Sequence, residues 1–155
     1  MIAITATVQY RGAPSELAAA FEPIRRRAFA AAAVYWQRTY LPLHFKTIAY
    51  LRYKGAFKPR SKGYRRRKQQ EPGRAALPLV WSGALRDAVL SAARISSTGR
   101  RTDLRMRGTR ALNLVGRPGM PDMKSEITAI NQSEAGKLAK DIDADMERAL
   151  NAIGG

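Results

Sequence analysis

The densest group of residues able to bind a ligand lies between Arg52 and Arg74. Ten of these residues are lysine or arginine, and Glu71 is their one acid. Three aromatic residues, Tyr53, Phe57 and Tyr64, are interleaved with the cations. Cations attract phosphate and carboxylate groups, and aromatic rings offer surfaces for stacking or packing. The alternative is a solvated loop that binds nothing. Aromatic rings in such a loop have no role unless something covers them. The three rings therefore favour a polyanion or an acidic protein as the ligand.

A catalytic or metal-binding set is much harder to assemble from this sequence. His44 is the single histidine, and its neighbours Leu43 and Phe45 predict a packed core residue. Ser82 and Asp87 could be drawn with His44 as a triad, but no nucleophile elbow surrounds the serine. Cysteine is absent, which removes thiolate nucleophiles and thiolate metal ligands together. We therefore expect no enzyme, no metal site and no cofactor.

Charge is distributed unevenly along the chain, whose net charge is +16. All but four of the 28 lysines and arginines lie in residues 1–117, whereas seven of the 12 acids lie in residues 118–155. Such a chain can bind polyanions or pair head to tail with its own copies. The expected acidic partner surface consists of Asp141, Asp145 and Glu147.

Hydrophobic periodicity predicts a strand over Ile2–Tyr10 and then a helix from about Ser15 to Arg38. Pro23 lies inside that helix, so we expect a kink or two abutting helices. A second long helix follows a capping box at Asn131–Glu134.

Three further strands are expected over residues 93–98, 102–107 and 109–115, with another possible over residues 126–130. Their arginines form either a polyanion-binding face or a guard against edge-to-edge aggregation. This set consists of Arg94, Arg105, Arg107 and Arg110.

The basic segment contains glycines and prolines throughout, so we expect mostly a loop or a loose hairpin there. An apolar stretch and a short capped helix follow it, which predicts a buried anchor for the arm. The anchor residues are Pro78, Trp81, Gly83 and Leu85.

These elements indicate one α+β domain over residues 1–155, with an extended basic arm at about residues 52–76. A small antiparallel or mixed sheet of about four to five strands is expected to pack against the long N-terminal helix and the C-terminal helix. The first residues show no secretory signal, and no apolar run is long enough to span a membrane.

The segment from Leu41 to Ala93 resembles the neck proteins of tailed bacteriophages, the virion-morphogenesis and tail-completion family. That family carries a P-L-x-x-[ST]-G-x-L-R segment after a basic loop, and Pro78–Arg86 matches it. Tyr64, Arg67 and Lys68 match the basic loop, and His44-Phe45 resembles its lead-in.

The resemblance implies a structural virion protein that joins head to tail. Such a subunit forms a ring, a hexamer or dodecamer, around packaged double-stranded DNA that it contacts without regard to sequence. Neighbouring neck, portal-side or tail-tube proteins would be its other partners, after assembly in the host cytoplasm. In this hypothesis the basic arm meets an adjacent subunit through Tyr53, Phe57, Arg60, Tyr64, Arg65, Arg66, Arg67 and Lys68. The alternative is a non-specific nucleic-acid-binding protein that acts as a monomer or dimer.

Overall fold

The computed structural model of the chain describes residues 14–58, 60–70, 79, 83–91, 94–98, 101–105 and 122–153. Within them, six α-helices, one short 3-10 helix and a two-stranded antiparallel sheet make an α+β protein. The chain divides into two compact units. Unit 1 comprises Met1–Trp36, Arg94–Arg105 and Gln132–Gly155, and unit 2 comprises Gln37–Ala93 and Met106–Asn131. A single domain over residues 1–155 stays a prediction.

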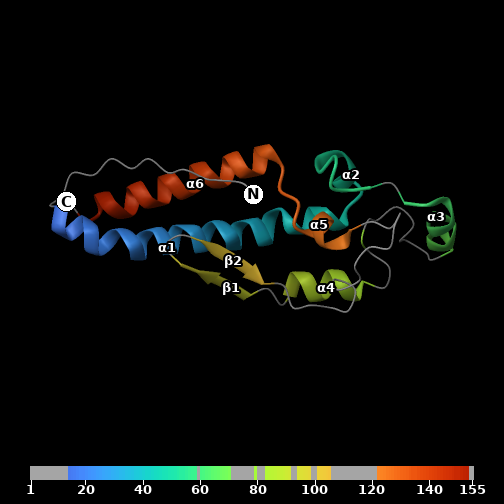
Figure 1. Cartoon of the computed structure of the whole chain (residues 1–155), viewed down its shortest axis with the longest axis horizontal. Helices are drawn as coiled ribbons and strands as arrows, with labels where there is room; N and C mark the ends of the chain where they lie inside the picture. Colours follow the sequence, from blue (N-terminus) through green and yellow to red (C-terminus); the bar gives the residue numbers. More distant parts are fainter. Residues whose placement is uncertain are drawn as a thin grey trace. The chain divides into compact units, whose positions relative to one another are not determined.

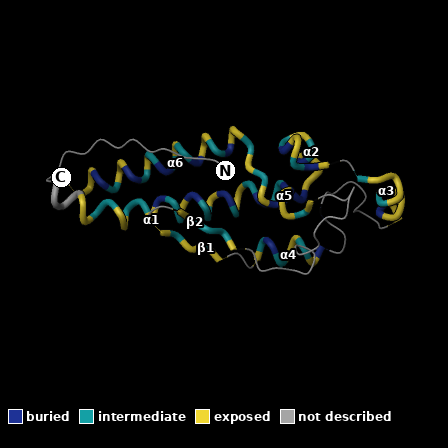
Figure 2. Tube along the Cα trace, viewed as in Figure 1, coloured by how far each residue is buried: buried dark blue, intermediate teal, exposed yellow. Residues whose placement is uncertain are grey.

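Unit 1 is built on two long helices that lie side by side and run in opposite directions (Figure 1). Helix α1 spans Pro14–Thr39, of which the part through Trp36 belongs to this unit, and α6 spans Gln132–Asn151. Buried positions recur every four residues on each helix, so that each buries one stripe (Figure 2). They are Ala28, Ala32 and Trp36 in α1 and Glu134, Leu138, Ile142, Met146 and Leu150 in α6. The predicted long N-terminal and closing helices are thus confirmed.

Helix α1 continues through Pro23 without a break. Of the two expected alternatives, two abutting helices are therefore excluded, and a kink at Pro23 stays a prediction. Proline removes one backbone hydrogen bond and costs about 3 kcal/mol inside a helix. Burial of the stripe that begins at Ala28 offsets this cost, because a helix in a folded protein is stabilised mainly by packing.

The sheet of unit 1 is a hairpin of β1, Arg94–Ser97, and β2, Thr102–Arg105. The backbone N–H of Thr98 donates to the carbonyl of Arg101 at 2.8 Å and closes the turn. The Ser97 hydroxyl donates to the carbonyl of Arg26 at 3.0 Å, which attaches the hairpin to α1. Two of the predicted strands are confirmed here, whereas those over residues 2–10 and 109–115 lie outside the described residues.

Unit 2 is organised around the 3-10 helix η1, Leu41–Phe45. It contacts three short helices: α2 at Ala49–Arg52, α4 at Ala84–Ser91 and α5 at Met123–Ile127. Proline in its first turn suits a position where no backbone donor is needed. Leu41, His44 and Phe45 are all buried, which makes η1 the core of this unit.

Helix α5 replaces the strand that was considered for residues 126–130. Asp122 caps it by accepting hydrogen bonds from the backbone N–H groups of Lys124 and Ser125, at 3.0 and 3.2 Å. The side-chain and backbone hydrogen bonds from Ser125 lower the pKa of Asp122. Glu126 and Ile127 are both fully buried, which a strand with alternating faces would not achieve for two adjacent residues. The strand prediction is therefore wrong.

Gly83 precedes α4 with a φ of +86°, in the left-handed region that favours glycine. Gly83→Ala is expected to destabilise the protein by about 1–2 kcal/mol, because an L side chain is strained in this conformation. Open space or ordinary contact distance surrounds the added methyl group, so the cost comes from the backbone. Urea unfolding measures the difference. Gly63→Ala in the same unit is the control, since Gly63 has a helical φ and open space around its Cα, and a larger loss there would contradict this account.

Candidate functional site

The basic segment forms a helix, α3, over Lys62–Gln69. The hydroxyl of Ser61 accepts a hydrogen bond from the backbone N–H of Tyr64 at 3.2 Å and caps its first turn. Three cations in the last turn face the negative end of the helix dipole, which stabilises them there. The expectation of a loop or loose hairpin is therefore wrong for residues 62–69, and residues 71–76 of the predicted arm lie outside the described residues.

The two sides of α3 differ in burial. Tyr64 is half-buried and Lys68 is only 3% exposed, and the two are one helical turn apart. The ammonium group of Lys68 lies 5.6 Å from the centre of the Tyr64 ring. The rest of the helix surface is exposed and holds Arg65, Arg66 and Arg67, which spread over roughly 200° of its circumference because consecutive helical residues are about 100° apart. Exposed guanidinium groups on a capped helix can bind carboxylates or phosphates through charge-assisted hydrogen bonds.

A buried ion pair fixes the chain just before α3. Arg60 donates from both terminal nitrogens to the two carboxylate oxygens of Glu126, at 2.6 and 2.5 Å. The Arg60 side chain is 7% exposed and that of Glu126 is 0% exposed. The backbone N–H of Lys58 also donates to Glu126, at 3.3 Å. Arg60 was predicted to meet a neighbouring subunit, but its guanidinium is already satisfied within the chain.

Burial and charge together shift the pKa of Arg60 and of two tyrosines near this ion pair. Burial acts to lower the pKa of Arg60, but the hydrogen bond and the charge of Glu126 outweigh burial and raise it. Burial raises the pKa of Tyr50 and that of Tyr64, against an opposing effect of the Arg60 charge. Both phenols therefore stay neutral up to a higher pH than free tyrosine.

Aromatic rings pack around His44 at the core of unit 2. The rings of His44 and Tyr53 are 4.0 Å apart, and those of Tyr53 and Phe57 are stacked at 5.9 Å. His44 Nδ1 donates to the backbone carbonyl of Glu126 at 2.8 Å, since a carbonyl can only accept. Tyr53 and Phe57 are 3% and 6% exposed. Both rings are thus packed within the chain itself, and their role in contacting a neighbouring subunit stays a prediction.

The arginines of the predicted strands lie partly in the described hairpin. Arg94 and Arg105 are both exposed and stand directly opposite each other across β1 and β2. Among the described residues neither has an ion-pair partner. Arg107 and Arg110 lie outside the described residues. The structure therefore places two of the four arginines together.

The predicted acidic surface on α6 is partly neutralised by its own helix. Asp141 pairs with Lys137, and Asp145 pairs with Arg148 at 3.4 Å. Glu147 is exposed and has no ion-pair partner in the described part of the chain. Exposed pairs one helical turn apart contribute only about 0.3–0.5 kcal/mol, so a partner's arginines can replace them at little cost.

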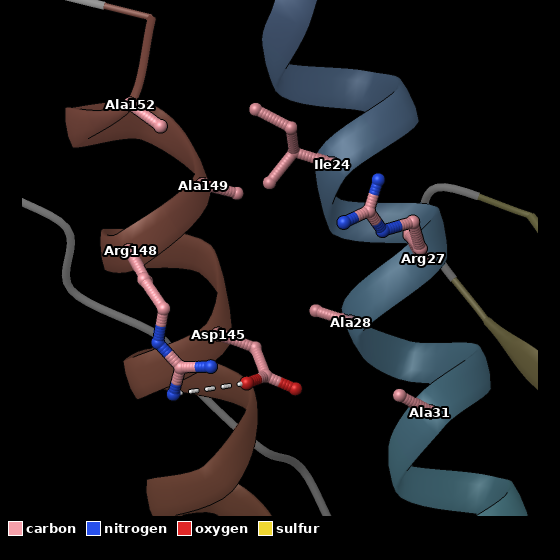
Figure 3. A pocket seen from close by; sticks show the side chains of 8 residues that line it. All are labelled: Ile24, Arg27, Ala28, Ala31, Asp145, Arg148, Ala149 and Ala152. Carbon is pink, nitrogen blue, oxygen red and sulfur yellow. Dashed lines mark ion pairs between the residues drawn. The ribbon is translucent and has the colours of Figure 1, made fainter. Parts of the chain in front are cut away.

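A hollow of about 330 Å³ separates α1 and α6 in unit 1 (Figure 3). Ile24 and four alanines line it, and these small side chains leave the space between the helices unfilled. Arg27, Asp145 and Arg148 lie at its edge, where the last two form their ion pair. The alanines are Ala28, Ala31, Ala149 and Ala152.

Two of the four predicted anchor residues are described. Gly83 is buried and Leu85 is half-buried at the start of α4, whereas Pro78 and Trp81 lie outside the described residues. Leu79 is 5% exposed and has a φ of +56°, which is strained for a leucine. Leu79, the first leucine of the segment Pro78–Arg86, is thus a buried apolar residue.

Among the described residues, no three histidine, aspartate or glutamate side chains come close enough together to hold a metal ion. No helix in that part of the chain has the length and apolar character to cross a membrane.

The residues that carry the resemblance to phage neck proteins lie in unit 2. His44, Phe45, Tyr53 and Lys68 are buried there. No family model, curated protein or solved structure matches the chain. Four of the matching positions are therefore buried, whereas Arg67 and Arg86, which also match, are exposed.

The sequence did not predict helix α3 or the buried ion pair between Arg60 and Glu126 that precedes it. Ser61, a favoured cap residue ahead of a run without proline, was the available signal for the helix. No comparable signal existed for the pairing of Arg60 with Glu126, which are 66 positions apart.

Proposed function

We propose that this chain is a structural subunit of the neck of a tailed-phage virion. In this proposal, copies of the chain form a ring, a hexamer or dodecamer, that joins head to tail around the DNA channel. The ring contacts neighbouring neck, portal-side or tail-tube proteins and is assembled in the host cytoplasm. The motif from His44 to Arg86 supports this proposal. Residues 2–10 and 109–115 would supply two more strands and give a sheet of four.

The observation that carries the proposal is the exposed cationic side of α3 on a chain that also bears an acidic helix. Arg65, Arg66 and Arg67 are exposed on α3, and Glu147 is exposed on α6. Two different surfaces of opposite charge on one chain favour a head-to-tail contact between copies. Such heterologous contacts close into rings when the rotation between subunits allows it.

Imaging of assembled particles tests the proposal directly. A tag on the chain should appear as a ring of density at the head–tail junction in averaged electron micrographs. Particles made without the chain should lack that ring and should not carry stable tails. Tag density confined to the capsid shell or the tail tip, or missing from particles altogether, would rule out a neck role.

A non-specific nucleic-acid-binding protein is the second candidate, and the net charge of +16 favours it. This second function predicts that a monomer or dimer binds DNA and that the chain is absent from virions. Light scattering after size-exclusion chromatography, with and without the portal and tail proteins, distinguishes the two functions. Rings that form only with those partners support the neck subunit, and a monomer or dimer under every condition supports the alternative.

A further inference from the structure

Arg94 and Arg105 form a like-charged pair at a position where sheets usually avoid one. Residues directly opposite each other on an antiparallel pair have Cβ atoms only about 4.5–5.5 Å apart, and like charges there are destabilising. The register of β1 and β2 places these two arginines in this arrangement. The hairpin has only two short strands, and such a hairpin is marginally stable by itself. The repulsion between the two guanidinium groups therefore destabilises a hairpin that has little stability of its own.

The one acid of the described hairpin lies on the same face as the arginine pair, but its carboxylate is shared with a third arginine. Asp103 lies on β2 two residues before Arg105, but it pairs with Arg101 at 2.9 Å. Side chains on the opposite face of the hairpin attach it to α1. There, the Ser97 hydroxyl lies 2.7 Å from that of Thr102 and 3.0 Å from the carbonyl of Arg26. The arginine pair is thus left on the outer face, with both guanidinium groups able to turn toward one external anion.

The surroundings of the pair add to its attraction for anions. The segment of α1 that holds the hairpin is itself Arg25-Arg26-Arg27, of which only Arg25 has an ion-pair partner among the described residues. Ser96 is exposed and lies on the same face of β1 as Arg94, two residues along the strand. Its hydroxyl is a further donor beside the guanidinium groups.

We propose that Arg94 and Arg105 clamp one phosphodiester group of double-stranded DNA between them. A guanidinium group presents paired donors that match phosphate oxygens, and two such groups across one strand pair can share a single phosphate. An anion bound between them removes the repulsion that the free hairpin carries. The contact is sequence-blind, because it involves the backbone of the duplex and no base edge. This inference rests on the proposed function for the presence of packaged DNA beside the chain.

Binding of a mixed-sequence duplex to the full chain, measured over a range of salt concentrations, tests the clamp. Arg94→Gln with Arg105→Gln should reduce the slope of log affinity against log salt by about 0.9, since the two arginines share one phosphate and each lost phosphate contact contributes about 0.9. The matched control is Arg38→Gln with Arg86→Gln, which removes the same charge from two exposed positions outside the hairpin. The control should leave the slope nearly unchanged. An equal loss in both double variants would overturn the clamp in favour of net charge alone.

The arginine geometry is tested by a conservative variant and by inorganic phosphate. Arg94→Lys with Arg105→Lys should keep most of the slope but lose affinity severalfold, because ammonium groups cannot form the paired hydrogen bonds. Phosphate should raise the melting temperature of the wild type above its value in chloride at equal ionic strength, and the double glutamine variant should lose this difference. A double glutamine variant that melts well below the wild type in chloride would show that the arginines stabilise the hairpin themselves, and would overturn the proposal.

The outcomes for the clamp and for the neck function are separable. Double glutamine subunits that enter particles normally while binding DNA as tightly as the wild type would refute the clamp and leave the neck function standing. A clamp that binds DNA as described, on a chain that is absent from the neck, would refute the neck function alone.

Discussion

Glu126→Gln is expected to lower the free energy of unfolding by about 3–5 kcal/mol, because it leaves the Arg60 guanidinium buried without a counter-charge. Arg60 is 7% exposed, so water cannot replace the lost carboxylate. The two charge-assisted hydrogen bonds, at 2.6 and 2.5 Å, are weakened in the same step. Urea unfolding followed by circular dichroism measures the loss.

A double-mutant cycle separates the buried pair from its individual residues. Arg60→Met combined with Glu126→Gln should cost clearly less than the sum of the single variants, since no unpaired charge remains. Asp141→Asn, which breaks an exposed pair with Lys137, is the matched control and should cost about 0.3–0.5 kcal/mol. High salt should abolish the effect of Asp141→Asn and preserve most of the effect of Glu126→Gln. A loss below 1 kcal/mol for Glu126→Gln would show that the pair does not hold unit 2 together.

Replacing Arg65, Arg66 and Arg67 together with serine should leave the subunit folded and block its entry into particles. The three side chains are exposed, and α3 keeps the Ser61 cap, the half-buried Tyr64 and the buried Lys68. The change therefore removes the cationic surface and little of the core. Co-purification of the variant with virions, together with the yield of infectious particles, measures the effect.

A charge-matched control and a charge swap sharpen this experiment. Serine at Arg38, Lys46 and Arg86 makes the same change in net charge at three exposed positions outside α3 and α6 and should be incorporated normally. Arg66→Glu and Glu147→Arg should each reduce incorporation. Combining them should recover part of it, because a head-to-tail contact brings both surfaces together in every ring interface. Normal assembly of the triple serine variant would mean that α3 makes no contact with a neighbour.

Much of the fold could be predicted where local periodicity and packing agree. The stripe through Leu138, Ile142 and Met146 follows a helical period, and its residues are buried as that period requires. The hairpin was indicated by alternation on both sides of a turn. In each case the signal lies within about ten consecutive residues, so no knowledge of distant contacts was needed.

The errors arise where a distant contact overrides the local pattern. Residues 126–130 alternate weakly as a strand would, but the capped turn at Asp122 and the long-range pairing of Glu126 with Arg60 select a helix. Glycine and proline around α3 suggested a loop, although Gly63 lies in the first turn, where a glycine costs little. The packing of Tyr53 and Phe57 against His44 is a further contact that a single sequence does not reveal.

The buried contacts that hold α3 in place affect how tightly a partner can be bound. A flexible cationic arm would lose conformational entropy on docking, about 1–2 kcal/mol for each residue it orders. Helix α3 is formed before any partner arrives, with its base fixed by Arg60 and Glu126 and its inner side by Tyr64 and Lys68. Most of that entropy is already lost on folding, so a small contact between a few guanidinium groups and carboxylates can suffice. Assembly through α3 should accordingly show only a small change in heat capacity, since it buries little apolar surface and orders little chain.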